Sequence, residues 1–365
     1  MMPVRSEQQW LYSQIYFLHP DQGDAVEPLA LRAVCDQFVL EVIPNLVSAF
    51  QEQGWIEQFF FIRYAEGGYH LRLRFQGEAE YLDGPVRAQL ETAVADFFAA
   101  QQAPLWPAGT EITADTLLES GCLRYATYEP EIDKYGGPAG LAVAEAHFQV
   151  SSEICMLVLA AEQQTNISRS QFALELMDIL LSEFGADPHE KAFLLRAYTA
   201  YWMGMVQPGY HEQIVTAMEE NYQQRRAKFA QRFTHGKMGA LEERWQGRSP
   251  NLFQVWREHV GNLLDTLSDL ETSGQLLSPI QQHVAERQAL LSTVPTINAA
   301  PTVALLLLPN YVHMLNNRLG LTPLQEVQLA YLLYRHLEET YAATVDDLYT
   351  LVLEPNLAAV MQAVS

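Results

Sequence analysis

The 365-residue sequence lacks the motifs that mark several common enzyme classes. It contains neither the GxxxxGK[ST] loop that cradles nucleotide phosphates nor a GxGxxG turn after a strand. HExxH, GxSxG and a cysteine–histidine pair at zinc-ligand spacing are also missing. These absences argue against nucleotide-dependent, zinc-dependent and serine-hydrolase chemistry, and we expect no cofactor and no metal.

Cysteine and long apolar runs are scarce as well. The three cysteines, Cys35, Cys122 and Cys155, are odd in number and far apart, which predicts reduced thiols and no disulfide framework. No run of about eighteen apolar residues occurs, and MMPVRSEQQW lacks the apolar region of a signal peptide. We therefore expect a cytoplasmic protein without a membrane partner.

Basic residues are few in comparison with acidic residues. Lys and Arg number 22 against 44 Asp and Glu, so the formal net charge is −22. A chain this acidic repels polyphosphate and has few cations with which to displace counterions. We expect no direct nucleic-acid partner.

What is present predicts an α+β fold. Residues 1–135 read as strand, helix, strand, strand, helix, strand, which is the order of a ferredoxin-like, split βαβ antiparallel sheet covered by helices. The expected elements are strands at 9–18, 59–64, 69–75 and 122–130, and helices at about 28–54 and 85–102. Residues 136–365 have apolar spacing typical of a helical bundle, with predicted caps at Asp187 and Thr322 and mobile loops at 103–120 and 234–250.

The hairpin FFFIRYAEGGYHLRLRF, residues 59–75, carries the first group of candidate site residues. Strand alternation directs His70, Arg72 and Arg74 to one face and the apolar residues between them to the other. A half-exposed strand with solvated arginines explains the pattern equally well. Arg63 and Tyr64 on the first arm are further candidates.

Two other polar stretches interrupt apolar surroundings. TYEPEIDKYGGPAG, residues 127–140, places Lys134 and Tyr135 before a Gly-Gly turn. In YVHMLNNRLG, residues 311–320, His313 and Asn317 are four residues apart and share a helix face, and Arg318 follows. A lone histidine in an apolar helix is more often a hydrogen-bonded core residue than a catalyst.

Four segments, in this order, resemble the C-terminal domain of class I lantibiotic dehydratases, which also occurs as a separate protein in thiopeptide-type bacteriocin biosynthesis. They are WLYSQIYF, WIEQFFFIRYAEGGYHLRLRF, YEPEIDKYGGPAGLAVAEAHFQVSSE and HMLNNRLGLTPLQEVQLAYLLYR. In full-length relatives a larger domain uses glutamyl-tRNA to glutamylate Ser or Thr of a ribosomal precursor peptide. The C-terminal domain then eliminates glutamate to leave dehydroalanine or dehydrobutyrine.

The resemblance implies that this chain is a lyase acting on a ribosomal precursor peptide, with a separate protein as its glutamylating partner. It places the elimination residues on Arg72, Arg74 and His313. Guanidinium groups bind carboxylates through two hydrogen bonds, so two arginines on one strand face would form a clamp for glutamate. The residues expected to bind substrate are Arg63, Tyr64, His70, Lys134, Tyr135, Asn317 and Arg318.

One departure and two alternatives remain. Lys134 stands where the family usually has arginine, and lysine keeps the charge but loses the planar fork. The same family includes thiopeptide pyridine synthases, which join two dehydroalanines by a formal aza-[4+2] cycloaddition and expel the leader peptide. A non-catalytic protein that delivers the precursor peptide is the third reading, and whether the chain forms a homodimer stays open.

Overall fold

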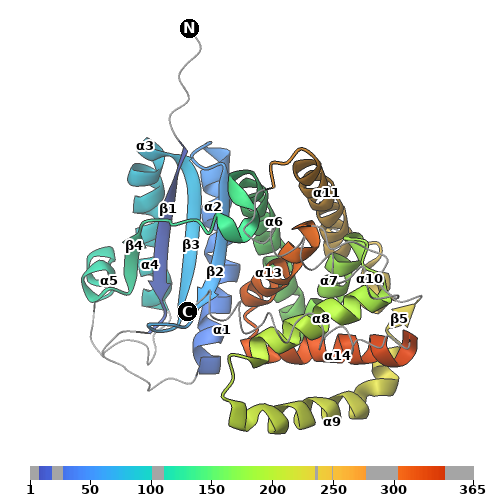
Figure 1. The fold of residues 1–365 in the computed structure, drawn as a ribbon. Helices are drawn as coiled ribbons and strands as arrows, with labels where there is room; N and C mark the ends of the chain where they lie inside the picture. The colour runs from blue at the N-terminus through green and yellow to red at the C-terminus, as the bar shows by residue number, and fades with distance from the viewer. Residues whose placement is uncertain are drawn as a thin grey trace. The chain divides into compact units, whose positions relative to one another are not determined.

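The computed structural model describes residues 8–18, 28–100, 111–234, 237–248, 250–276 and 303–341. The chain divides into two compact units, each described here by itself (Figure 1). Unit 1 comprises Met1–Pro130 and Glu145–Gln164, and unit 2 comprises Glu131–Ala144 and Thr165–Ser365. Helix α6 (Gly137–Gln164) therefore contributes to both, which differs from a single boundary after residue 135.

Unit 1 is built on a four-stranded antiparallel sheet. Its strands are β1 (Gln8–Tyr16), β2 (Gln58–Tyr64), β3 (His70–Glu78) and β4 (Leu123–Ala126), in the spatial order β2-β3-β1-β4. This is the order of a ferredoxin-like sheet, so the predicted α+β class is confirmed. The turn between β2 and β3 uses Gly67 and Gly68 at φ 72° and 108°, backbone angles that glycine adopts without a Cβ clash.

The helices of unit 1 correct one sequence expectation. The stretch predicted as one helix forms α1 (Pro28–Glu41) and α2 (Ile43–Glu52), which are separated at Val42. Pro44 lies in the first turn of α2, where its missing N–H costs nothing, and it could not sit inside a continuous helix without breaking a hydrogen bond. The remaining helical segments are α3 (Ala79–Tyr81), the π-helical turn η2 (Leu82–Val86), α4 (Arg87–Ala100) and α5 (Ala114–Ser120).

The sheet has one face that forms the core with α1, α2 and α4. Leu71, Leu73 and Phe75 of β3 are fully buried on this face, and Phe75 packs edge-on against Phe50 of α2. The Tyr125 hydroxyl of β4 donates a hydrogen bond of 3.1 Å to Glu91 of α4. The opposite face carries His70, Arg72 and Arg74, as the alternation predicts.

The unit 1 part of α6 lies against β2. The Phe148 ring is 5.3 Å from the Phe60 ring, and the Phe61 backbone N–H donates to the Ser152 hydroxyl oxygen at 3.3 Å. By length and composition, 137–164 and 30–52 could each cross a membrane. About half of each apolar window is buried, 56% and 44%, and core helices of soluble proteins pass the same test, so this is weak evidence for a span.

Unit 2 is mostly helical. Its elements are η3 (Asp133–Tyr135), α7 (Arg169–Glu183), α8 (Pro188–Met203), η4 (Pro208–Tyr210), α9 (His211–Ala230), β5 (Phe233–Thr234), β6 (Lys237–Met238), α10 (Ala240–Trp245), α11 (Leu252–Thr272), α13 (Val303–Arg318) and α14 (Pro323–Tyr341). The predicted cap at Asp187 is present, since its carboxylate accepts from the backbone N–H groups of His189 and Glu190. Thr322 likewise accepts from the Gln325 N–H.

Candidate functional site

Unit 1 carries a cluster that we call the arginine face, defined by Tyr12, Tyr64, His70, Arg72 and Arg74. The strand register produces it, because Tyr12 of β1 pairs with Arg74 and Tyr64 of β2 pairs with His70. Side chains of paired residues lie on the same side of an antiparallel sheet. The structure thus brings together four of the residues predicted from the hairpin.

Arg72 is half-buried and held on two sides. Its guanidinium carbon lies 3.5 Å from the centre of the Tyr64 ring, a cation–π contact. Its Nε donates a hydrogen bond of 3.2 Å to Nε2 of His70. Both contacts leave the terminal Nη groups as donors, and these are the atoms with which a guanidinium binds a carboxylate.

His70 is the residue that orients Arg72. It is buried, its ring stacks on Tyr16 at 4.3 Å, and its Nδ1 lies 2.7 Å from the Gly68 carbonyl oxygen. Burial lowers the pKa of His70 from its ordinary value, and the charges of Arg72 and Arg124 lower it further. A neutral ring whose Nδ1–H donates to Gly68 and whose Nε2 accepts from Arg72 satisfies all these contacts.

Arg74 is more deeply buried than Arg72, with 6% of its surface exposed. Its guanidinium carbon lies 4.2 Å from the Tyr12 ring centre and 5.0 Å from those of Phe60 and Tyr128. Nearby Glu145 accepts a 2.8 Å hydrogen bond from the Tyr128 hydroxyl. Burial raises the pKa of Glu145, an effect that the Tyr128 bond and the Arg74 charge partly offset. Arg72 is therefore better exposed than Arg74 for contact with a ligand.

Arg63 lies on the other face of the sheet, away from the arginine face. It is 3% exposed and forms a 2.7 Å ion pair with Asp36 of α1. A buried guanidinium needs such a partner to offset its loss of hydration. This position does not support the prediction that Arg63 binds substrate.

Unit 2 contains a second arrangement, which we call the histidine cluster: Tyr198, Trp202, His313 and Glu326. Nδ1 of His313 lies 3.0 Å from a carboxylate oxygen of Glu326, and the His313 ring centre is 4.7 Å from that of Trp202. The His313 side chain is 23% exposed, whereas that of Glu326 is 1% exposed. A buried carboxylate at one ring nitrogen leaves the other nitrogen, Nε2, for proton transfer.

Tyr198 completes the histidine cluster from α8. Its hydroxyl donates a hydrogen bond to the same carboxylate oxygen of Glu326. Burial raises the pKa of Tyr198 well above its ordinary value, and the Glu326 charge raises it further. Tyr198 therefore stays a neutral donor near neutral pH, and it holds the Glu326 carboxylate in place beside His313.

The glycine-rich turn at 133–140 contacts α13, the helix that bears His313. The Tyr135 ring is buried and lies 6.1 Å from that of Tyr311, and Asn310 Nδ2 donates to the Lys134 carbonyl oxygen at 3.4 Å. Gly140 permits this turn, since a Cβ there would lie 2.0 Å from the Tyr135 carbonyl oxygen. The second and third polar stretches of the sequence thus meet within unit 2.

The other predicted residues of unit 2 differ in accessibility. Lys134 is 35% exposed and pairs with Glu131 at 3.0 Å. Asn317 is half-buried. Arg318 is fully buried, and its Nη1 donates to the Met314 carbonyl oxygen at 3.0 Å. This burial does not support the prediction that Arg318 binds substrate.

Sequence reasoning missed several partners of the predicted residues. Glu326 lies in the apolar stripe LQEVQLAYLLY of α14, and a lone acid inside such a stripe was the signal that could have identified it. Tyr198 and Glu145 carry no comparable signal, because only the packing of separate helices places them. Among the described residues, no group of His, Cys, Asp and Glu is arranged to hold a metal ion.

Comparison with known proteins supplies the family. The family model described as lantibiotic biosynthesis dehydratase C-term matches residues 10–337. No curated protein matched the chain in a search of those sequences. Several solved structures share its fold at low identity, and three of them are TsrL, TbtD and MibB.

TsrL, known from its crystal structure, has 19% sequence identity to this chain and a TM-score of 0.60. The match covers 95% of this chain and 98% of the TsrL chain. The pyridine synthase TbtD from thiomuracin biosynthesis has 16% sequence identity and a TM-score of 0.57. The match covers 92% of this chain and 99% of the TbtD chain. The tRNA-dependent lantibiotic dehydratase MibB from Microbispora sp. 107891 is 18% identical with a TM-score of 0.54, and 94% of this chain matches 29% of MibB. With the family match spanning most of its length, this chain belongs to the lantibiotic biosynthesis dehydratase C-terminal family.

Proposed function

We propose that this protein eliminates glutamate from glutamylated Ser or Thr residues of a ribosomal precursor peptide, which leaves dehydroalanine or dehydrobutyrine. The observation that carries the proposal is the state of Arg72. Its guanidinium is oriented by Tyr64 and His70, its Nη groups remain as donors, and it is only half-buried. Such a group is suited to bind the carboxylate of glutamate as it departs.

The reaction needs a base and a stabilised leaving group. A base removes the Cα proton, the electron pair forms the Cα–Cβ double bond, and the Cβ–O bond breaks so that glutamate leaves as a carboxylate. We assign the leaving carboxylate to Arg72, with Arg74 supplying positive charge from within the arginine face. Tyr64 and His70 act by positioning Arg72.

We assign the proton transfer to Nε2 of His313. Glu326 accepts at Nδ1 and Tyr198 supports Glu326, so the ring has a defined orientation and tautomer. A positioned acid–base group accelerates a reaction by about a hundredfold to ten-thousandfold. Lys134 lies beside α13 with 35% of its side chain exposed and is a candidate for peptide contacts. The Tyr135 ring is buried against Tyr311, and this burial does not support the prediction that Tyr135 binds substrate.

The proposal includes a separate glutamylating protein and a cytoplasmic location. MibB is a tRNA-dependent lantibiotic dehydratase of which this chain matches 29%, and we propose that tRNA-dependent glutamylation is carried out outside the matched region. The net charge of −22 supports this division, because a subunit that does not bind tRNA needs no basic surface.

Two other functions compete with elimination. The similarity to TbtD supports a pyridine synthase, which would join two dehydroalanines. Such an enzyme releases no glutamate, so the preorganised Arg72 favours elimination. A non-catalytic peptide-delivery protein is the third candidate. It would bind precursor peptide and leave the mass of every substrate unchanged.

Two peptide substrates distinguish these functions. One is a glutamylated serine peptide with its cognate leader, and the other carries two dehydroalanines in place of the serines. Mass spectrometry that shows loss of glutamic acid from the first supports elimination. Ring formation with leader loss from the second, without any change in the first, would replace elimination by cycloaddition.

The role of His70 predicts a specific pH dependence. Because the pKa of His70 is lowered, the ring is neutral above its ordinary value of 6.5, and the bond from Arg72 is present there. The bond is lost as the pH falls through the lowered pKa, since a protonated ring cannot accept. We therefore expect KM for glutamylated peptide to rise when the pH falls below the lowered pKa of His70. In H70Q the side-chain oxygen accepts at all pH values, so this rise in KM should be absent, and an identical rise in both proteins would contradict the role.

A further inference from the structure

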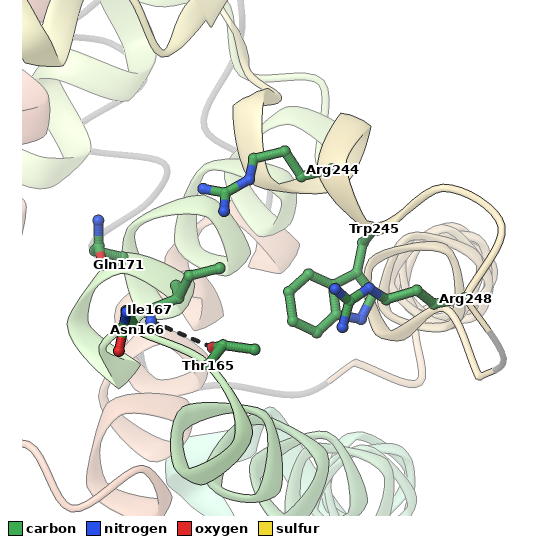
Figure 2. Close-up of a pocket in the computed structure, with 7 residues that line it drawn as sticks. All are labelled: Thr165, Asn166, Ile167, Gln171, Arg244, Trp245 and Arg248. Carbon is green, nitrogen blue, oxygen red and sulfur yellow. Dashed lines mark hydrogen bonds between the residues drawn. The ribbon is translucent and has the colours of Figure 1, made fainter.

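Unit 2 contains a hollow of about 270 Å³ that includes none of the residues discussed above. One wall is the turn between α6 and α7, with Thr165 and Asn166, together with Gln171 in the first turn of α7. The other wall is α10 and the residues after it, with Arg244 and Arg248. Figure 2 shows both arginine side chains extending from the α10 side toward the wall that carries Thr165 and Gln171. The hollow therefore has two cationic side chains on one wall and neutral polar groups on the other.

Among the described residues, no acidic side chain neutralises the two arginines. Neither Arg244 nor Arg248 forms an ion pair with any residue in the described ranges, although the chain has twice as many acidic as basic residues. By contrast, neighbouring Arg257 pairs with both Glu183 and Glu242. Two exposed guanidinium groups without a carboxylate partner in the described part of the chain give the hollow a local positive potential.

Arg248 and Trp245 form a preorganised wall. The guanidinium carbon of Arg248 lies 4.2 Å from the Trp245 ring centre, and Trp245 itself is buried with 5% exposed. Stacking on a fixed indole restricts the guanidinium to a plane while its N–H edge stays available for hydrogen bonds. Less conformational freedom is then lost when a ligand binds.

A third arginine, Arg232, lies near Arg244 and pairs with Glu175 at 4.0 Å. Burial lowers the pKa of Arg232, Glu175 partly restores it, and the charge of Arg244 lowers it again. The positive charge of Arg244 therefore acts on Arg232, whose own charge is offset by the ion pair with Glu175.

The opposite wall offers neutral donors. The Thr165 hydroxyl oxygen accepts from the Ile167 backbone N–H at 3.2 Å, the bond drawn in Figure 2, which fixes the Thr165 side chain in this wall. Gln171 uses its side-chain oxygen to accept from the Ser168 N–H, which leaves its NH₂ group as a donor. Donors thus lie on both walls of the hollow.

We propose that this hollow binds a carboxylate-bearing ligand of about the size of one amino acid, in the form of an acidic side chain of a peptide. Arg244 and Arg248 bind the carboxylate, Trp245 holds Arg248, and the neutral wall donates to the remaining oxygens. A planar carboxylate fits the guanidinium fork, whereas the net charge of −22 opposes a polyphosphate. The site is independent of the elimination chemistry proposed above.

Fluorine NMR of the full chain labelled with 5-fluorotryptophan tests the site. The Trp245 signal is assigned from W245F, or, if that variant does not fold, from the signal that shifts in R248Q. The probes are N-acetyl-glutamyl peptide amide, the same peptide with glutamine, and free glutamate. We expect a saturable shift of the Trp245 signal with the glutamyl peptide, no shift with the glutamine peptide, and weakening by added salt.

Variants decide the assignment. R244Q and R248Q should each raise the dissociation constant about tenfold, the loss of one charge-assisted hydrogen bond. R225Q, an exposed arginine of α9, is the matched control and should bind as the wild type does. If the Trp245 shift saturated with free glutamate but not with the glutamyl peptide, the ligand would be the free amino acid and not a peptide side chain. No saturable shift with either probe, or equal binding in R244Q, R248Q and R225Q, would overturn the site.

Discussion

R72Q lowers kcat/KM for glutamate elimination about a hundredfold, and glutamylated peptide accumulates when the glutamylating partner is supplied. Glutamine keeps the length and polarity of the side chain but loses the charge and the fork that binds a carboxylate through two bonds. Hydrogen bonds to charged groups contribute about 1.5–3 kcal/mol, and 1.4 kcal/mol corresponds to tenfold. The measurement is steady-state elimination from a glutamylated peptide, followed by mass spectrometry.

Two companion variants make this result specific to Arg72. R72K keeps the charge without the fork, so its rate should fall between those of the wild type and R72Q. Arg124 lies on the same side of the sheet, is exposed, and has its guanidinium carbon 4.6 Å from the Tyr16 ring centre. R124Q therefore removes a comparable cation outside the arginine face and should leave the rate near that of the wild type. If R124Q and R72Q lowered the elimination rate equally, the effect would arise from the loss of one positive charge on this side of the sheet and not from a specific role of Arg72.

H313N lowers kcat by about a hundredfold to ten-thousandfold, the range typical of a lost acid–base group, and changes KM little. E326Q and Y198F lower kcat less, because the ring remains but its orientation and tautomer are no longer held. Nitrogen-15 NMR of histidine-labelled protein reports the tautomer directly. We expect the Nδ1–H form of His313 in the wild type and a mixture of tautomers in E326Q.

The matched control for His313 is His189, an exposed histidine near the start of α8. H189N should retain wild-type turnover. If E326Q lowered folding stability and left both kcat and the His313 tautomer unchanged, Glu326 would be a structural residue only. If H313N retained wild-type kcat, another group would have to carry the proton, and the histidine cluster would have no part in catalysis.

The sequence predicted the sheet of unit 1 because its signals are local. Alternation in HLRLRF requires two faces, and Gly67-Gly68 permits the tight turn, so the hairpin and the placement of both arginines on one face follow. The break between α1 and α2 was missed although Pro44 was visible, because a proline in a first helical turn and one in a kinked helix look alike in sequence. α5 and α10 are one- to two-turn helices in stretches predicted as mobile loops.

The candidate site was predictable only in part, because pairing across helices has no local signature. Arg63 and Arg72 look equivalent in FIRY and HLRLR. Arg63 nevertheless pairs with Asp36 in the core, whereas Arg72 lies on the opposite face of the sheet. Their difference arises from the strand register, which a single strand does not specify. Likewise, Glu326 is thirteen residues from His313, and only the packing of α13 against α14 makes them partners.

The most direct test of the central claim is incubation of the purified protein with a glutamylated serine peptide bearing its cognate leader, without tRNA or ATP. The account predicts loss of the elements of glutamic acid and appearance of dehydroalanine, with the rate reduced in R72Q and H313N and retained in R124Q and H189N. An unchanged peptide mass, in the presence of a leader that binds the protein, would contradict elimination as its function.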